Sequence, residues 1–144
     1  MSKQLSNLIK RIGSLVPGFV GYETKESLRK TDYQIRLYVK RNLEKLIKNI
    51  ERDKLNLNND DLMKLDKAQN DLKVFNNKII NQVYGYDALM DRRDDNYLED
   101  IISNDSRMTD IIDSINYSDT NFETINDLHQ ELEDLLMNRQ DILR

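Results

Sequence analysis

Hydrophobic residues recur every three or four positions along most of this chain, which is the spacing of one face of an α-helix. The first such segment covers residues 1–16 and has basic and polar residues on its other side. Pro17 and Gly18 follow, and they end the segment because proline disfavours helix in the residue before it. We therefore predict a short amphipathic helix at the N-terminus.

A longer helix is predicted over residues 24–53, which contain neither glycine nor proline. Polar residues at 56–61 are typical of a turn that leads into a helix N-cap, and the helical spacing then resumes. Because the connection is short, the two helices should pack side by side and antiparallel, in the manner of a coiled coil. Residues 24–86 are therefore predicted to form a long antiparallel helical hairpin.

Residues 94–144 carry the same spacing but are strongly acidic. One helix is expected to begin near residue 98, with an interruption near Ser103–Ser106. A last helix should follow the capping-box pattern of Thr120 and Glu123. Neither a strand pattern nor a repeat is found, so the sequence predicts an all-α fold. We expect residues 1–144 to form a single domain, a four- to five-helix bundle built on the hairpin.

Composition excludes several classes of active site. The chain has no cysteine, which excludes disulfides, thiolate zinc sites and cysteine nucleophiles. Its one histidine, His129, has Asn126 three residues before it, where a di-iron bundle needs glutamate. Neither a P-loop nor a dinucleotide-binding glycine pattern occurs. We therefore expect no enzyme activity, no cofactor, no metal and no small-molecule substrate.

Hydrophobic runs are too short for a membrane span, which needs roughly 20 residues, and the N-terminus lacks the apolar core of a signal peptide. A cytoplasmic location is expected. Charge is distributed unevenly: residues 1–54 hold 13 basic and 6 acidic residues, and residues 94–144 hold 3 basic and 14 acidic ones. Since the acidic part is the nearest partner for the basic part, we expect them to pair within the chain or between two copies.

Four charged residues of the predicted hairpin share one flank next to its hydrophobic face. They are Lys25, Arg29, Asp32 and Arg36. Steps of four, three and four residues place them one above another, so they should be partly buried. They could form a structural ion-pair ladder, balanced by the acidic part of the chain. Alternatively, their surplus positive charge could bind an anionic group or the acidic segment of a partner.

Tyrosines should lie near this charged flank. Tyr22 precedes the first helix of the hairpin, and Tyr84 and Tyr86 follow the second, so an antiparallel hairpin brings all three to the same end. Their hydroxyls could bond to Asp32 or to loop backbone and so fix the turn. They could equally complete a small polar binding site, and the sequence leaves both interpretations open.

Two segments carry a resemblance. Pro17-Gly18-Phe19-Val20-Gly21-Tyr22 is followed by Lys25-Glu26 and then by Arg29, Asp32 and Arg36, and Tyr84-Gly85-Tyr86 lies near the middle of the chain. Together they resemble a family of short, uncharacterised bacterial and archaeal helical proteins with a PGxxGYxxKE segment and a central YGY segment. The resemblance implies a helical fold and implies no activity.

The favoured function is a non-enzymatic interaction or scaffold module that binds a protein partner or a second copy of itself, as a homo-oligomer. One alternative is a peripheral membrane protein that uses the N-terminal helix, whose polar side carries Lys3, Lys10 and Arg11. A further alternative is weak binding of nucleic acid or another anion by the helix over residues 24–53. The basic face of that helix comprises Lys30, Arg41, Lys45, Lys48 and Arg52.

Overall fold

The computed structural model describes residues 2–81, 95–115 and 121–143. Within these ranges the regular structure is helical throughout, without a strand, which confirms the predicted all-α class. The helices are α1 (Lys3–Leu15), α2 (Lys25–Asp53), α3 (Asn59–Asn81), α5 (Asp95–Ser114) and α6 (Phe122–Leu143), with a short 3-10 helix, η1 (Lys54–Asn56), between α2 and α3. Tyr84 and Tyr86 lie outside the described residues.

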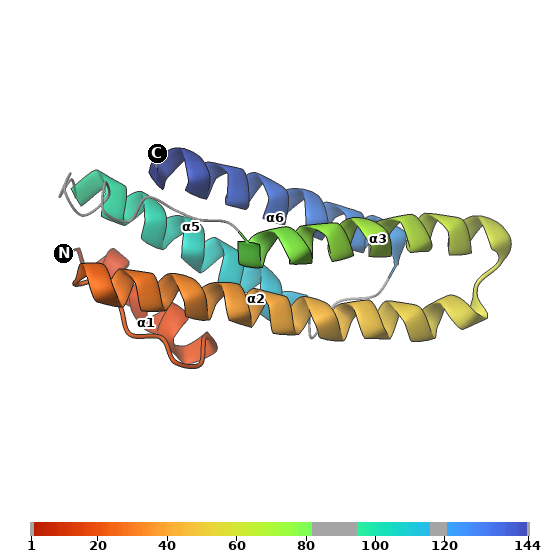
Figure 1. Cartoon of the computed structure of the whole chain (residues 1–144), viewed down its shortest axis with the longest axis horizontal. Helices are drawn as coiled ribbons and strands as arrows, with labels where there is room; N and C mark the ends of the chain where they lie inside the picture. Colours follow the sequence, from red (N-terminus) through yellow and green to blue (C-terminus); the bar gives the residue numbers. More distant parts are fainter. Residues whose placement is uncertain (1, 82–94, 116–120, 144) are drawn as a thin grey trace.

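Helix α3 runs back along α2 after the turn at η1, and the two helices pack against each other (Figure 1). Helix α5 also packs against α2, while α6 packs against α3 and α5. Helices α2 and α6 therefore lie on opposite sides of the core, as Figure 1 shows with α6 above and α2 below. Helix α1 packs against the outside of this group, along α5.

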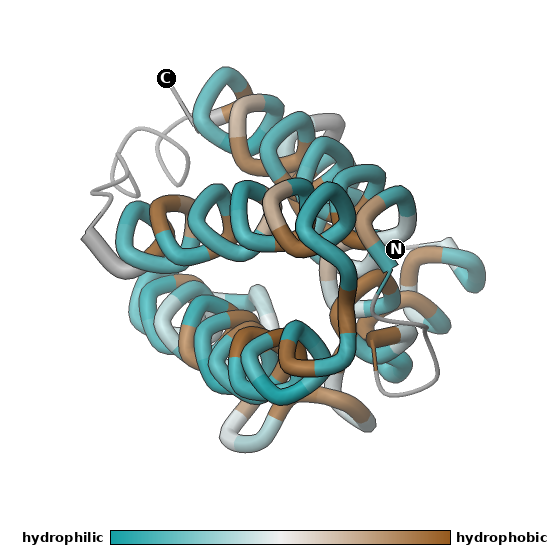
Figure 2. Tube along the Cα trace, turned by 90° about the vertical axis from the view of Figure 1, so that its right-hand side faces the viewer, coloured by the Kyte–Doolittle hydropathy of each residue, from teal (hydrophilic) through white to brown (hydrophobic). Residues whose placement is uncertain are grey.

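The core is formed by the hydrophobic faces that the sequence pattern predicts. Figure 2 shows hydrophobic and hydrophilic residues alternating along the helices, as expected when each helix turns one face inward. Ile12 of α1 is fully buried, and the rest of the hydrophobic face of α1 is partly buried against the same core. No helix in the described ranges is long and apolar enough to cross a membrane.

Local side chains define where the helices begin. The Thr24 hydroxyl accepts a hydrogen bond from the Ser27 amide at 3.0 Å, and the Ser27 hydroxyl accepts one from the Thr24 amide at 2.8 Å. This capping box starts α2 one residue after the predicted boundary. At α3, the side-chain oxygen of Asn58 accepts from the Asp61 amide at 2.9 Å, as expected from the polar turn.

The interruption predicted in the acidic part is absent from the structure, and the capping box predicted before the last helix is described only in part. Helix α5 is continuous through residues 103–106, so the expected interruption is wrong. Asn104, Asp105 and Ser106 are buried there and Ser103 is exposed, and a polar side chain inside a helix does not by itself break the helix. Helix α6 begins at Phe122, and Asn121 accepts from the Thr124 amide at 2.8 Å. Asn121 therefore caps this helix, and Thr120, to which the sequence pattern assigned a capping role, lies outside the described residues.

The turn between α1 and α2 covers the beginning of α2. Gly18 and Gly21 adopt positive φ angles of 79° and 93°, which side chains other than glycine rarely tolerate. A Cβ atom at Gly18 would approach the Gln34 side chain to 2.9 Å, so the turn lies directly against α2. The Thr31 hydroxyl donates to the Gly21 carbonyl at 2.6 Å and fixes this arrangement.

Candidate functional site

A chain of buried polar side chains connects α2, α5, α6 and the turn before α2. Asp32 and Arg36 come from α2, Asp105 from α5, Arg139 from α6 and Tyr22 from the turn. Each of the five is at most 6% exposed. Charged side chains are seldom buried to this extent unless they are paired.

Arg139 is the centre of this buried network. Its Nη1 donates to Asp32 Oδ1, and its Nε lies 3.0 Å from Asp105 Oδ1. The Tyr22 hydroxyl donates to Asp105 Oδ2 at 2.8 Å, and Arg36 Nε lies 3.0 Å from Asp32 Oδ2. Two guanidinium groups thus face two carboxylates, so ionised side chains balance in charge inside the core.

Burial changes the pKa of two groups of the network, Asp105 and Tyr22. It raises the pKa of the Asp105 carboxyl above its ordinary value, although the charge of Arg139 and the hydrogen bond from Tyr22 act in the opposite direction. The pKa of the Tyr22 hydroxyl is raised well above its ordinary value, first by burial and then by the negative charge of Asp105. Tyr22 therefore remains a hydrogen-bond donor at any pH at which the protein is ordinarily handled.

The structure brings together only part of the site that the sequence predicts. Asp32, Arg36 and Tyr22 join the network, but Tyr22 bonds to Asp105, where Asp32 or loop backbone was expected. Lys25 is half-buried, whereas Arg29 is exposed, so the expected burial of the flank is wrong at Arg29. The pair of Asp32 with Arg36 is present as the ladder required, and Arg139 of α6 is a further cation beside Asp32.

Two members of the network were not predicted, although the sequence contains a signal for both. Asp105 lies three residues after Ile102 and three before Met108, on the hydrophobic face of α5. Arg139 has the same relation to Leu136 and Ile142 on α6. A charged residue at a position that helical spacing assigns to the core is a candidate for a buried ion pair.

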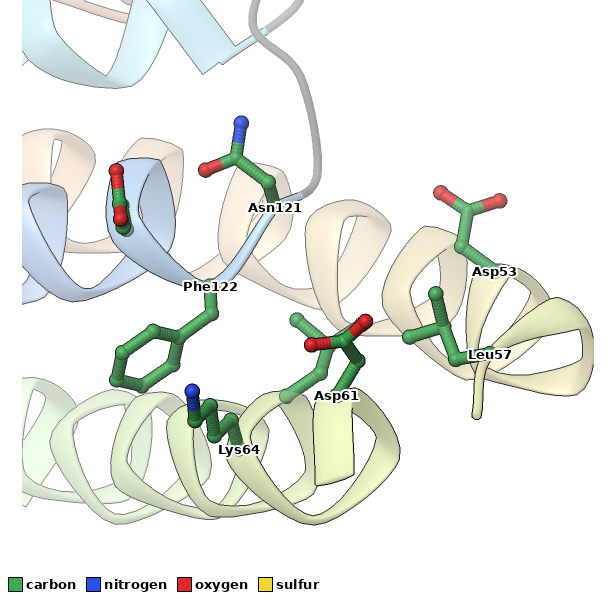
Figure 3. Close-up of a pocket in the computed structure, with 8 residues that line it drawn as sticks. Asp53, Leu57, Asp61, Lys64, Asn121 and Phe122 are labelled. Carbon is green, nitrogen blue, oxygen red and sulfur yellow. The ribbon is translucent and has the colours of Figure 1, made fainter. Parts of the chain in front are cut away.

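A surface hollow lies far from this network. It has a volume of about 650 Å³ and lies where the end of α2 meets the first turns of α3 and α6 (Figure 3). Asp53, Asp61 and Glu123 line it together with Lys64 and Phe122. Asp53 is 21 residues beyond Asp32 on the same helix, roughly 30 Å along its axis. The hollow and the buried network are thus separate features.

A second group of charges lies on the outer face of α2. Arg41, Lys45 and Lys48 are exposed, and helical geometry places them on the side opposite Leu43 and Leu46, which are buried in the core. They make no ion pair within the described part of the chain. We call these three residues, with Arg52 beyond them, the basic stripe.

The last residue of the stripe and a lysine beside the stripe do have partners. Lys40 pairs with Glu44 at 3.5 Å on the same helix, and Arg52 pairs with Asp53 at 3.5 Å. Pairs between the basic and acidic parts of the chain form elsewhere. Arg11 of α1 lies 3.1 Å from Asp110 of α5, and α3 pairs with α6 through Lys78 and Glu133 at 2.7 Å. Neutralisation within the chain thus leaves the middle of α2 uncovered.

Comparison of the chain with known protein families, with curated proteins and with solved structures finds no match. The membership in a family of short helical proteins that the segments at residues 17–36 and 84–86 suggest therefore stays a prediction. In the described ranges, His, Asp and Glu side chains form no group arranged to hold a metal ion. What the protein binds is therefore inferred from its own residues.

Proposed function

We propose that the protein is a non-enzymatic interaction module that binds the acidic surface of another protein through the basic stripe of α2. It acts as a single helical domain, a bundle built on the antiparallel hairpin of α2 and α3. The observation that carries the proposal is the exposure of Arg41, Lys45 and Lys48 without an ion pair in the described ranges. Such a face attracts acidic partners and repels basic ones.

The buried network supports a scaffold role for α2. Asp32 holds α2 to α6 through Arg139, which also holds α5 through Asp105. Because buried ion pairs hold α2 in place, its outer face keeps one orientation. Less conformational entropy is therefore lost when a partner binds. Tyr22, Asp32 and Arg36, the buried members of the polar cluster predicted from sequence, thus serve binding indirectly, because they support the helix that carries the stripe.

Two alternative functions have less support. Binding to a membrane through α1 would require its hydrophobic face to leave α5, where Ile12 is fully buried. Binding to single-stranded nucleic acid uses aromatic side chains among the cations. Tyr33 is an exposed aromatic residue of α2, and it lies eight residues before Arg41, away from the stripe. An acidic protein surface fits the stripe better.

The proposal is tested by titrating the protein with three acidic probes: a glutamate-rich helical peptide, single-stranded DNA and anionic lipid vesicles. The variant Arg41→Gln/Lys45→Gln/Lys48→Gln should bind the peptide about tenfold more weakly than wild type, since exposed ion pairs contribute about 0.2–1 kcal/mol each. Fluorescence anisotropy of labelled peptide and DNA, together with vesicle sedimentation, measures the three affinities.

A matched control removes the same charge from another helix. Lys64, Lys67 and Lys73 are exposed on α3, and replacing all three by glutamine should leave peptide binding near the wild-type value. Equal loss in both variants would reveal attraction to overall charge and contradict the proposal. Binding of DNA or vesicles, but not of peptide, would assign the corresponding alternative function instead.

A further inference from the structure

The outer face of α6 carries the opposite charge to the basic stripe. Glu123, Asp127, Asp134 and Asp141 are all exposed. At about 100° per residue they fall on one side of the helix, opposite its buried leucines. Those leucines are Leu132 and Leu136. We call the four carboxylates the acidic stripe.

The two stripes are opposite in charge, and their charged residues are similarly spaced. Arg41 and Lys48 are seven residues apart, as are Asp127 and Asp134, so both stripes repeat after about two helical turns. Each stripe spans roughly 15–30 Å of helix. Met137, 60% exposed, lies on the same outer face and can add apolar contact to the charge pairing.

Within one chain the two stripes face away from each other. Helices α2 and α6 lie on opposite sides of the core, and each stripe lies on the side of its helix turned away from that core. The buried pair that joins these two helices has the reverse signs, with Asp32 on α2 and Arg139 on α6. The stripes can therefore be neutralised by each other only between molecules.

We propose that the basic stripe of one copy of this chain binds the acidic stripe of a second copy, head to tail. This inference rests on the proposed function and names the partner. Because the stripes lie on opposite sides, each contact joins two different surfaces and leaves one stripe of each kind uncovered at the ends. The product is an open chain of copies that lengthens with protein concentration. Added salt screens exposed charges and dissociates it.

Two variants that each remove one stripe test the head-to-tail contact. The first is Arg41→Gln/Lys45→Gln/Lys48→Gln, and the second is Asp127→Asn/Asp134→Asn/Asp141→Asn. Neutral side chains are chosen because reversed charges would create a new complementary pair. Sedimentation velocity at low ionic strength should show concentration-dependent assembly of the wild type. Each variant alone should associate at least about tenfold more weakly.

The equal mixture of the two variants provides the decisive measurement. Each variant keeps the stripe that the other has lost, so the mixture should form dimers and stop there. A wild type that stays monomeric at low ionic strength overturns the proposal, and so does a mixture that forms no dimer. Variants that assemble as well as the wild type overturn it too. The α3 variant described above should assemble normally, and circular dichroism checks that every variant remains helical.

Failure of this inference can be told apart from failure of the proposed function. A wild type that stays monomeric but binds the glutamate-rich peptide through α2 retains the proposed function, with a different protein as partner. A wild type that neither assembles nor binds the peptide loses both.

Discussion

Helix α2 places charge in two opposite settings. Near its beginning, Asp32 and Arg36 are buried and paired with groups of the same chain. One to three turns further along, Arg41, Lys45 and Lys48 are exposed on the other face. Buried charges stabilise a fold only as a complete set, because a single missing partner leaves an ion without water. Exposed charges contribute little to stability and are free to act on other molecules.

The largest effect is expected from breaking the buried set at its centre. Replacing Arg139 by methionine removes a buried cation from beside Asp32 and leaves Asp105 without its buried cation. We expect the free energy of unfolding to fall by about 3–5 kcal/mol, as measured by urea denaturation.

The matched control for that loss is Arg107→Met. Arg107 is also an arginine of the acidic part, but its side chain is 58% exposed and its Nε donates to Glu131 at 2.7 Å. This variant should lose at most about 1 kcal/mol. Similar losses of unfolding free energy for the Arg107 and Arg139 variants would show that burial does not determine how much each arginine stabilises the fold.

A smaller loss is expected from removing one hydroxyl at the edge of the network. Tyr22→Phe deletes the hydrogen bond to Asp105 while keeping the ring. The free energy of unfolding should fall by about 1–3 kcal/mol, because a buried charged acceptor loses a donor. Tyr33→Phe removes a hydroxyl from a side chain that is 58% exposed and should leave stability unchanged. A thermal shift as large for Tyr33 as for Tyr22 would contradict this assignment.

The pH dependence of stability offers a finer test of the same carboxylate. The pKa of Asp105 is raised in the folded protein, so the folded state holds this proton to higher pH than the unfolded state does. The contribution of Asp105 to stability is therefore largest at low pH. It is lost as pH rises from the ordinary value of 3.8 through the raised pKa.

Asp105→Asn isolates this contribution from the other acidic groups. The stability of wild type minus that of the variant should decrease as pH rises through this window, measured by urea denaturation at each pH. A difference that grows with pH would mean that attraction to Arg139 exceeds the effect of burial, and that the folded pKa is lowered.

The smallest effect on stability is expected at the basic stripe. Arg41→Gln/Lys45→Gln/Lys48→Gln should change the free energy of unfolding by less than about 0.5 kcal/mol per residue, since these side chains are exposed. The same variant should lose binding to acidic partners. A loss of stability comparable to that of the Arg139 variant would show that the stripe is part of the fold.

Local features of this fold could be predicted because they depend on neighbours in sequence. Thr24, one residue before α2, and the polar turn before α3 mark helix starts through short-range hydrogen bonds. The interruption expected at residues 103–106 was wrong because Asn104, Asp105 and Ser106 are polar residues buried in the core. Asn104, for example, accepts a hydrogen bond from Asn138 on α6 at 3.0 Å. Helical spacing alone does not distinguish a polar core position from a break.

The buried network was predictable only in part, for the same physical reason. Asp32 and Arg36 are four residues apart on one helix, so their pairing follows from helix geometry. Arg139 is 107 residues from Asp32. Helical spacing predicts which face of a helix is buried, but it does not predict which other helix packs against that face. Tertiary packing decides which helices meet. The unexpected element is a cation from the acidic part of the chain, which net charge would not suggest.

The position of Arg139 on the last helix has a consequence for synthesis on the ribosome. Chains emerge from their N-terminus, so α2 and α5 are available before α6 exists. Until then, Asp105 cannot be buried beside its guanidinium partner, and packing of α5 against α2 would desolvate an unpaired carboxylate. We expect the core around Asp105 to close only after α6 has been translated, because α6 carries the guanidinium that pairs with Asp105.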